Sequence, residues 1–166
     1  MTPVLNIDDA KAVTLDYGGS KRFGATISRV GAALGTAGLG CMYAKVEPGK
    51  RAFPFHNHHG NEEMFVILEG VGTYRLGDGE YPVKAGDICI APAGGPETAH
   101  QIINTGDTTL RYLAISTRND PDVVEYPDSG KFAALALGDG DSIMSARLRY
   151  VGRLESGVDY MDGEEL

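Results

Sequence analysis

The sequence contains no tryptophan and only two cysteines in 166 residues. Cys41 and Cys89 each lie in an apolar, strand-like context, C-M-Y-A and I-C-I-A, and no export signal accompanies them. Disulfide scaffolds belong mainly to secreted proteins, so we predict two buried free thiols. The first nine residues, M-T-P-V-L-N-I-D-D, are acidic and lack the apolar segment of a signal peptide, which predicts a cytoplasmic protein.

Long apolar runs and an excess of basic residues are also missing. The uncharged apolar runs are far too short to span a bilayer. The chain has 15 Lys and Arg residues against 23 Asp and Glu residues, a formal net charge of -8. Nucleic acids and anionic membranes require a basic face, so neither is expected as a partner. We expect the acidity to serve solubility and the partner to be a small molecule.

Glycine and proline, in contrast, are abundant, with 23 and 8 residues. Many tight turns are implied, unlike a helical bundle. Short strand-like segments alternate with Gly, Pro and Asp turns, which is typical of an antiparallel sandwich or barrel. The G-D-G at 77–79 and the T-G-D at 105–107 predict hairpins. No internal repeat is visible, so we predict one all-β domain over residues 1–166. The expected strands are residues 10–17, 25–30, 39–46, 53–58, 63–68, 72–76, 81–83, 87–91, 100–104 and 108–117.

The segment after position 118 gives weaker signals. Residues 119–122 predict a turn, and residues 123–131 predict a loop crossing the surface. Residues 132–137 fit either a short helix or a strand. Residues 143–150 predict a last element, and the acidic residues 160–166 predict a tail.

Three of the four histidines fall within residues 56–59, in the segment F-H-N-H-H-G-N-E-E. On an extended strand, side chains two positions apart share a face, so His56 and His58 project together and Asn57 projects away. The turn through residues 60–61 lets a carboxylate approach the same point. Two imidazoles and a carboxylate that converge make a site for a divalent transition metal.

Two motifs here resemble those of the cupin superfamily. The family's first motif reads G, five residues, H-x-H, three or four residues, E, six residues, G. Its second reads G, five residues, P-x-G, two residues, H, three residues, N. The matching positions are His56, His58, Glu63 and Gly70 in the first and Gly86, Pro92, Gly94, His100 and Asn104 in the second.

The chain departs from these motifs twice. Six residues rather than five separate Gly49 from His56, and five rather than two separate Gly94 from His100. Neither departure removes a ligand, but the second inserts three residues beside the site. The resemblance implies a cupin jelly roll, a double-stranded β-helix barrel with its core at about 25–118. An N-terminal strand segment, 1–24, and a C-terminal extension, 119–166, would flank this core.

The resemblance also implies one divalent transition metal per chain, which could be Zn, Mn, Fe, Ni or Co. Its ligands would be His56, His58, Glu63 and His100. The neighbour of Glu63, Glu62, would face the opposite side of the strand, at the rim or in solvent. His59 directly follows His58, so its side chain would face the opposite side of the strand from His56 and His58. We therefore expect His59 at the surface.

Cupins also resemble one another in pairing through N-terminal strands, and two-fold pairing is the commonest oligomer. The small, glycine-rich segment 31–40 reads as a connection, and within it residues 32–39 offer a small-residue surface without an obvious role inside the chain. We therefore predict a homodimer.

Three imidazoles and one carboxylate would leave one or two metal positions open for chemistry. The first hypothesis is a sugar or sugar-phosphate isomerase or epimerase, since the tail resembles that of small cupins classed as candidate sugar-phosphate isomerases. The second is a dioxygenase acting on a small organic acid, enol or phenol. The third is a cupin that binds a small ligand without catalysis. The cupin fold hosts all three, so fold alone does not decide.

An isomerase also needs a group that moves a proton. The candidates are Glu97, in the inserted loop, and Gln101, Tyr43, Tyr74 and Tyr112. A phosphate would need a cation at the mouth of the site. The candidates are Lys45, Lys50, Arg51, Arg75, Arg111 and Lys131.

Overall fold

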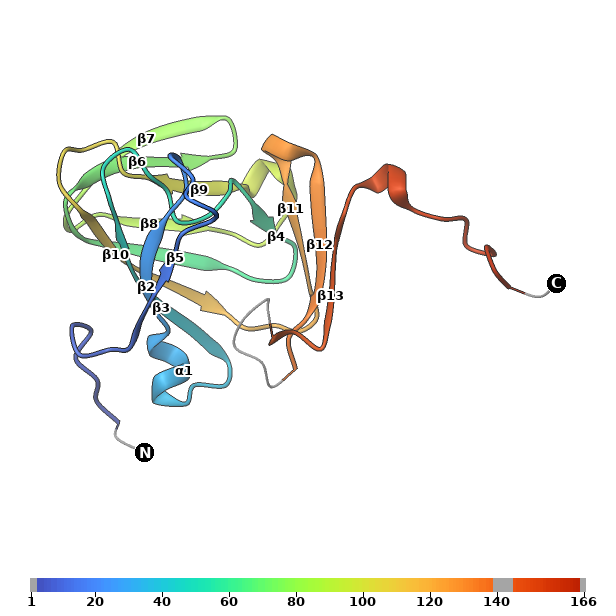
Figure 1. Ribbon diagram of the computed structural model, residues 1–166, viewed down its shortest axis with the longest axis horizontal. Coiled ribbons are helices and arrows are strands. Elements are labelled where there is room, and N and C mark those ends of the chain that lie inside the picture. Colours follow the sequence, from blue (N-terminus) through green and yellow to red (C-terminus); the bar gives the residue numbers. More distant parts are fainter. Residues whose placement is uncertain (1–2, 139–144, 165–166) are drawn as a thin grey trace.

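Thirteen strands in the described part of the chain form three antiparallel sheets (Figure 1). The structure is a computed structural model that describes residues 3–138 and 145–164. The largest sheet has the order β1 (Ala12–Leu15), β2 (Ala25–Ser28), β3 (Leu39–Val46), β10 (Leu110–Thr117), β5 (Glu63–Glu69) and β8 (Ile88–Ala91). A second has the order β7 (Gly79–Lys84), β6 (Val71–Leu76) and β9 (His100–Ile103). The third has the order β13 (Leu148–Gly152), β12 (Lys131–Ala136), β11 (Asp122–Tyr126) and β4 (Asn57–His58). The helical segments are short: α1 (Val30–Leu34), η1 (Pro96–Thr98), η2 (Pro127–Ser129) and η4 (Leu154–Ser156).

The main hydrophobic core lies between the first two sheets. Ala44, Val46 and Ile67 come from the six-stranded sheet, and Tyr74 and Ile102 come from the three-stranded sheet. Side chains on a strand alternate between faces, which points every second residue of these strands into the core. The predicted all-β jelly-roll class is confirmed.

Strand β5 contains an apolar run, residues 64–68, but only one face of the strand is buried. Phe65 and Ile67 are buried, but Met64 and Leu68 are 41% and 38% exposed. Ile90 of the neighbouring strand β8 is also exposed, so among the described residues no layer covers the outer face of this sheet edge. An apolar run therefore did not distinguish a sheet covered on one face from a sheet covered on both.

The two predicted hairpins have different outcomes. The turn at 77–79 does join the paired strands β6 and β7. The turn at 105–107 does not form a hairpin, because β9 pairs with β6 while β10 pairs with β3 and β5. The buried Asn104 side chain donates hydrogen bonds to the Val46 and Thr108 carbonyls and accepts one from the Gly106 amide. These bonds hold the chain where it crosses from one sheet to the other.

The C-terminal region departs most from the sequence expectation. Residues 123–131 are not a surface loop, because most of them belong to β11 and η2, and β11 pairs with both β4 and β12. Residues 132–137 are mostly strand β12. The last predicted element is β13, shifted to Leu148–Gly152, and residues 143–144 lie outside the described residues. Residues 157–164 are exposed and extend away from the sheets, and residues 165–166 of the predicted tail are not described (Figure 1).

The glycine-rich segment 31–40 also differs from the prediction of a plain connection, because it begins within helix α1. This helix packs against β3. A Cβ at Gly31 would lie 2.8 Å from the Cys41 amide nitrogen, so only glycine allows this approach. Gly35 ends the helix in the left-handed conformation, a common helix C-cap. Within the described residues, none of the helices has the length and apolar character needed to cross a membrane.

Candidate metal centre

Four side chains converge at one end of the barrel, three of them from strands of three different sheets. His56 follows an irregular stretch and forms an isolated bridge to His100 at the start of β9, while His58 lies on β4 and Glu63 begins β5. Glu63 Oε2 lies 4.0 Å from His56 Nε2, 3.9 Å from His58 Nε2 and 2.7 Å from His100 Nε2. Ligand atoms of His56, His58 and Glu63 all lie within 4.8 Å of one another, close enough to hold a metal ion.

The other ring nitrogen of each histidine has an oxygen partner. His56 Nδ1 lies 2.8 Å from the Pro54 carbonyl, and His58 Nδ1 lies 2.6 Å from Asp122 Oδ2. His100 Nδ1 lies 3.4 Å from the Thr98 carbonyl. A carbonyl or carboxylate accepts a hydrogen bond, so the rings of His56 and His58 carry a proton on Nδ1. This tautomer leaves the Nε2 lone pairs of His56 and His58 directed toward Glu63, as metal ligation requires. His100 Nε2 instead donates a hydrogen bond to Glu63 Oε2, and this proton would be released when His100 binds a metal.

The surroundings of His56 and Glu63 set the protonation of these two groups. Burial and the neighbouring His100 lower the pKa of His56 to about 3, so its ring is neutral at pH 7. Burial disfavours the Glu63 carboxylate, but the hydrogen bond to His100 and the nearby histidines outweigh it and lower its pKa to about 2. A neutral imidazole and an ionised carboxylate are the forms that bind metals.

This donor set fits a divalent transition metal. Nitrogen from imidazole and oxygen from carboxylate suit Zn, Fe, Mn, Ni and Co, and His56, His58, Glu63 and His100 would hold the ion. Glu62 and His59, which the alternation of side chains along a strand excluded as metal ligands, lie outside the cluster. Glu62 is exposed, and His59 Nε2 lies 3.3 Å from Glu125 Oε2 on the outside of the site.

Three of the five acid/base candidates, Glu97, Tyr74 and Gln101, have their polar groups engaged within the protein. Glu97 is exposed on η1, and its carboxylate accepts a hydrogen bond from the Gly95 amide of its own loop. The Tyr74 hydroxyl donates to the Ile90 carbonyl in the core. Gln101 is buried, donates to the Phe53 carbonyl and accepts from Arg75. Each side chain already has a structural partner.

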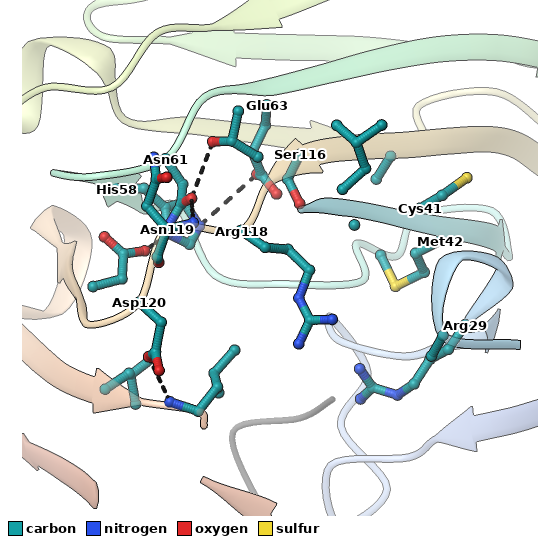
Figure 2. Close-up of a pocket in the computed structure, with 18 of the residues that line it drawn as sticks. Arg29, Cys41, Met42, His58, Asn61, Glu63, Ser116, Arg118, Asn119 and Asp120 are labelled. Atoms are coloured by element: carbon teal, nitrogen blue, oxygen red, sulfur yellow. Dashed lines mark hydrogen bonds and ion pairs between the residues drawn. The ribbon is translucent and has the colours of Figure 1, made fainter. Parts of the chain in front are cut away.

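Two cavities meet at the cluster, and Glu63 lines both. The inner cavity, about 220 Å³, also contains His56 and His100 and is otherwise mainly apolar. The outer cavity, about 590 Å³, contains His58 and opens toward α1 and the segment after β10. Figure 2 shows the guanidinium groups of Arg29 and Arg118 pointing into the outer cavity.

The cations of the outer cavity are not those that the sequence suggested. None of the six predicted Lys and Arg side chains lines either cavity among the described residues. Arg29 and Arg118 do, together with Asp120, whose carboxylate accepts hydrogen bonds from the Leu137 and Gly138 amides. Ala32, Ala37 and Leu39 form part of the same wall, so the small-residue segment has a role within the chain.

Two further residues of the site lie on β11, in the region predicted as turn and loop. Asp122 holds His58, and the ring of Tyr126 stacks on His56 with centroids 6.2 Å apart. Asp122 lies in the turn-like sequence N-D-P-D, and Tyr126 precedes a proline. Neither context signals a partner 64 or 70 residues earlier in the chain, so only the pairing of β11 with β4 reveals these contacts.

An antiparallel barrel that gathers three histidines and a glutamate around a cavity is the architecture of the cupin class. Residues 42–116 match the family model of the cupin domain, a range that contains all four converging side chains. Over this range the chain resembles a cupin domain, and a solved structure resembles it over nearly its whole length. This candidate sugar phosphate isomerase from Acidithiobacillus ferrooxidans is 26% identical, has a TM-score of 0.75 and covers 94% of this chain and 95% of its own.

Two further proteins resemble the chain. A sugar phosphate isomerase from the cupin superfamily of Silicibacter pomeroyi has a TM-score of 0.77, covers 96% of this chain and 98% of its own, and is 22% identical, a level that supports the fold alone. The oxalate-binding protein of Thermotoga maritima is 38% identical over 71 residues, which are 43% of this chain and 55% of that protein. The match therefore spans about half the length of this curated relative.

Proposed function

We propose that this cupin-like protein is a metal-dependent isomerase or epimerase of a small sugar or sugar phosphate. The observation that carries the proposal is the shared position of Glu63, which joins the metal-binding cluster to an outer cavity containing two arginines. The outer cavity has room for a hydroxylated chain, and its cations suit a phosphate or carboxylate. The likeness to the Acidithiobacillus protein supports the same assignment.

The metal-binding cluster and the outer cavity would have different roles. His56, His58, Glu63 and His100 would hold the metal, which would supply positive charge to stabilise the substrate oxygen as a neighbouring C–H proton leaves. Arg29 and Arg118 would bind the anionic end of the substrate in the outer cavity. The inner cavity, lined mainly by apolar groups, would exclude water from the reacting carbon. The proton carrier stays a prediction, with Glu97 or a tyrosine in that role.

A second candidate function is the binding of a small dicarboxylate without turnover. The similarity to an oxalate-binding protein favours it, because an oxalate would present carboxylates both to a metal and to the arginines. The two functions differ in outcome, since a binding protein would release its ligand unchanged.

Metal dependence is tested first. Elemental analysis of purified wild type should give close to one transition metal per chain, and His58→Ala should remove most of it. His59→Ala is the matched control, because His59 is the adjacent histidine but lies outside the cluster. Wild type that stays metal-free after reconstitution would contradict the proposal.

Turnover is tested with a panel of sugar phosphates, the corresponding free sugars, enediols and small organic acids in D₂O. Isomerisation by proton removal exchanges the C–H next to the carbonyl, so proton NMR should show loss of that signal. Arg118→Ala should lower the turnover rate of phosphorylated substrates much more than that of free sugars.

Turnover that requires Fe and consumes O₂ would indicate a dioxygenase instead of an isomerase. Tight binding of one ligand that is released unchanged would favour the binding protein. Full activity in Glu97→Gln would exclude Glu97 as the proton carrier.

A further inference from the structure

The inner cavity has few polar groups beyond the metal-binding cluster. Its wall contains the apolar side chains of Met42, Phe53, Pro54, Phe65, Ile102 and Ala114. Besides His56, His100 and Glu63, only Gln101 and Tyr112 contribute polar side chains to this wall among the described residues. A hydroxylated sugar chain would leave several buried hydroxyls unpaired here, each at a cost in binding free energy. The cavity therefore suits a compact group with few polar atoms.

The two polar side chains differ in how their hydrogen-bonding groups are used. The Gln101 amide is engaged at both ends, donating to the Phe53 carbonyl and accepting from Arg75. In the part of the chain that the structure describes, no hydrogen bond is found for the Tyr112 hydroxyl. Tyr112 thus brings an O–H donor to the cavity without a protein acceptor.

The position of Tyr112 is fixed by its surroundings. It lies in the middle of β10, paired with Ala44 on β3 and Ile67 on β5, and it is 3% exposed. The edge of its ring meets Phe65, with centroids 6.2 Å apart. Burial, followed by the charge of Glu63, raises the pKa of Tyr112 above its ordinary value, so the hydroxyl stays protonated at neutral pH.

We propose that the Tyr112 hydroxyl donates a hydrogen bond to an oxygen of the small molecule bound at the metal centre. The inner cavity would then take the compact carbonyl or carboxylate end of that molecule, while its hydroxylated or phosphorylated remainder lies in the outer cavity. This assignment rests on the proposed metal site and adds a division of the substrate between the two cavities. Tyr112 is a binding residue in this assignment, and it transfers no proton.

Tyr74 provides a matched control on the same core. It is a buried tyrosine that also contacts Phe65, but its hydroxyl donates to the Ile90 carbonyl and it lines neither cavity. Tyr112→Phe removes a hydroxyl directed to a ligand, whereas Tyr74→Phe removes one that bonds the protein. Tyr112→Phe should therefore lose ligand affinity, whereas Tyr74→Phe should lose thermal stability.

The experiment uses full-length wild type, Tyr112→Phe and Tyr74→Phe, each loaded with Co²⁺ and titrated with oxalate and, separately, with glycolate. Dissociation constants come from the visible absorption of Co²⁺, metal content from elemental analysis and stability from thermal unfolding. Tyr112→Phe should bind at least one probe about tenfold more weakly, because a hydrogen bond to a charged acceptor contributes about that factor or more. Its Co²⁺ content and Tm should stay close to those of wild type. Tyr74→Phe should unfold at a lower temperature and bind both probes as wild type does.

Three results would overturn the inference. One is binding by Tyr112→Phe within twofold of wild type for both probes. Another is an equal loss of affinity in Tyr74→Phe, which would indicate a general effect on the core. The third is Co²⁺-loaded wild type that binds neither probe. Because the readout is equilibrium binding, a chain that isomerises no sugar can still support the role of Tyr112, so the two proposals fail separately.

Discussion

His58 Nδ1 lies 2.6 Å from Asp122 Oδ2, a contact between residues 64 positions apart in the sequence. It ties β4 to β11 and fixes the ring of one histidine in the metal-binding cluster. The second carboxylate oxygen accepts a hydrogen bond from the Gly60 amide. Burial disfavours both charges, yet the pair raises the pKa of His58 and lowers that of Asp122. The carboxylate therefore stays ionised and holds the Nδ1 proton in place.

Replacing this carboxylate should weaken metal binding without removing a ligand. We expect Asp122→Asn to lower metal affinity about 10- to 100-fold, the usual effect of losing a partner that orients a ligating histidine. Competition with a chromogenic chelator measures the change. Asp128→Asn is the control, because Asp128 is on the adjoining η2 and pairs with Arg75, away from the cluster. Equal affinities for the two variants would show that Asp122 does not orient His58 for the metal.

The Asn104 side chain should matter for folding and leave the metal centre intact. Asn104→Ala would leave the buried Val46 carbonyl, the Thr108 carbonyl and the Gly106 amide without this partner. We expect a loss of about 2 kcal/mol or more in unfolding free energy, measured by denaturant titration. Thr105→Ala, at an exposed neighbour, should change stability by less than about 0.5 kcal/mol. A folded Asn104→Ala protein that lacks metal would contradict a purely structural role.

The two thiols should react slowly in the native protein. Burial, with a contribution from Asp87, raises the pKa of Cys89 to about 11, and burial raises that of Cys41. Thiolate is the reactive form, and a raised pKa keeps both groups protonated at pH 8. Intact mass after brief iodoacetamide treatment at pH 8 should show little labelling, and the denatured chain should take up two groups. Rapid labelling of Cys89 in the native protein would contradict its buried position.

The chain is expected to form a homodimer. The structure moves the candidate surface, since the small residues of segment 32–39 form part of the outer cavity while β5 and β8 expose Met64, Leu68, Ile88 and Ile90. Light scattering at micromolar concentration should give twice the 17.6 kDa mass of one chain. Ile88→Asp, on the 64% exposed side chain, tests whether this face takes part. A wild-type mass of 17.6 kDa would contradict pairing.

Local patterns predicted much of the barrel and the position of its histidines. The expected strand 39–46 coincides with β3, and the i, i+2 relation correctly placed His56 and His58 beside Glu63. These features depend on side-chain alternation and on turn residues, which short segments contain. The same alternation of side chains explains why Glu62 and His59 lie outside the metal-binding cluster.

The failures depend on contacts between distant segments. A T-G-D turn is compatible with a hairpin, and only the pairing of β9 with β6, and of β10 with β3 and β5, shows that the chain changes sheets there. Residues 123–131 contain Pro, Asp and Gly and read as a loop, yet β11 gains its hydrogen bonds from β4 and β12. Tyr74 and Tyr112 both lie on inward faces, so alternation does not tell which hydroxyl meets the protein and which meets a cavity.

The two cavities are built from parts of the chain that differ in tolerance to substitution. Phe65, Tyr112 and Ala114, in the inner wall, belong to the packed core, where a change of volume destabilises the whole barrel. Arg29 and Arg118 stand just outside strand ends, before α1 and after β10. Single substitutions at Arg29 or Arg118 should therefore alter the outer wall at a smaller cost in stability than substitutions in the inner wall.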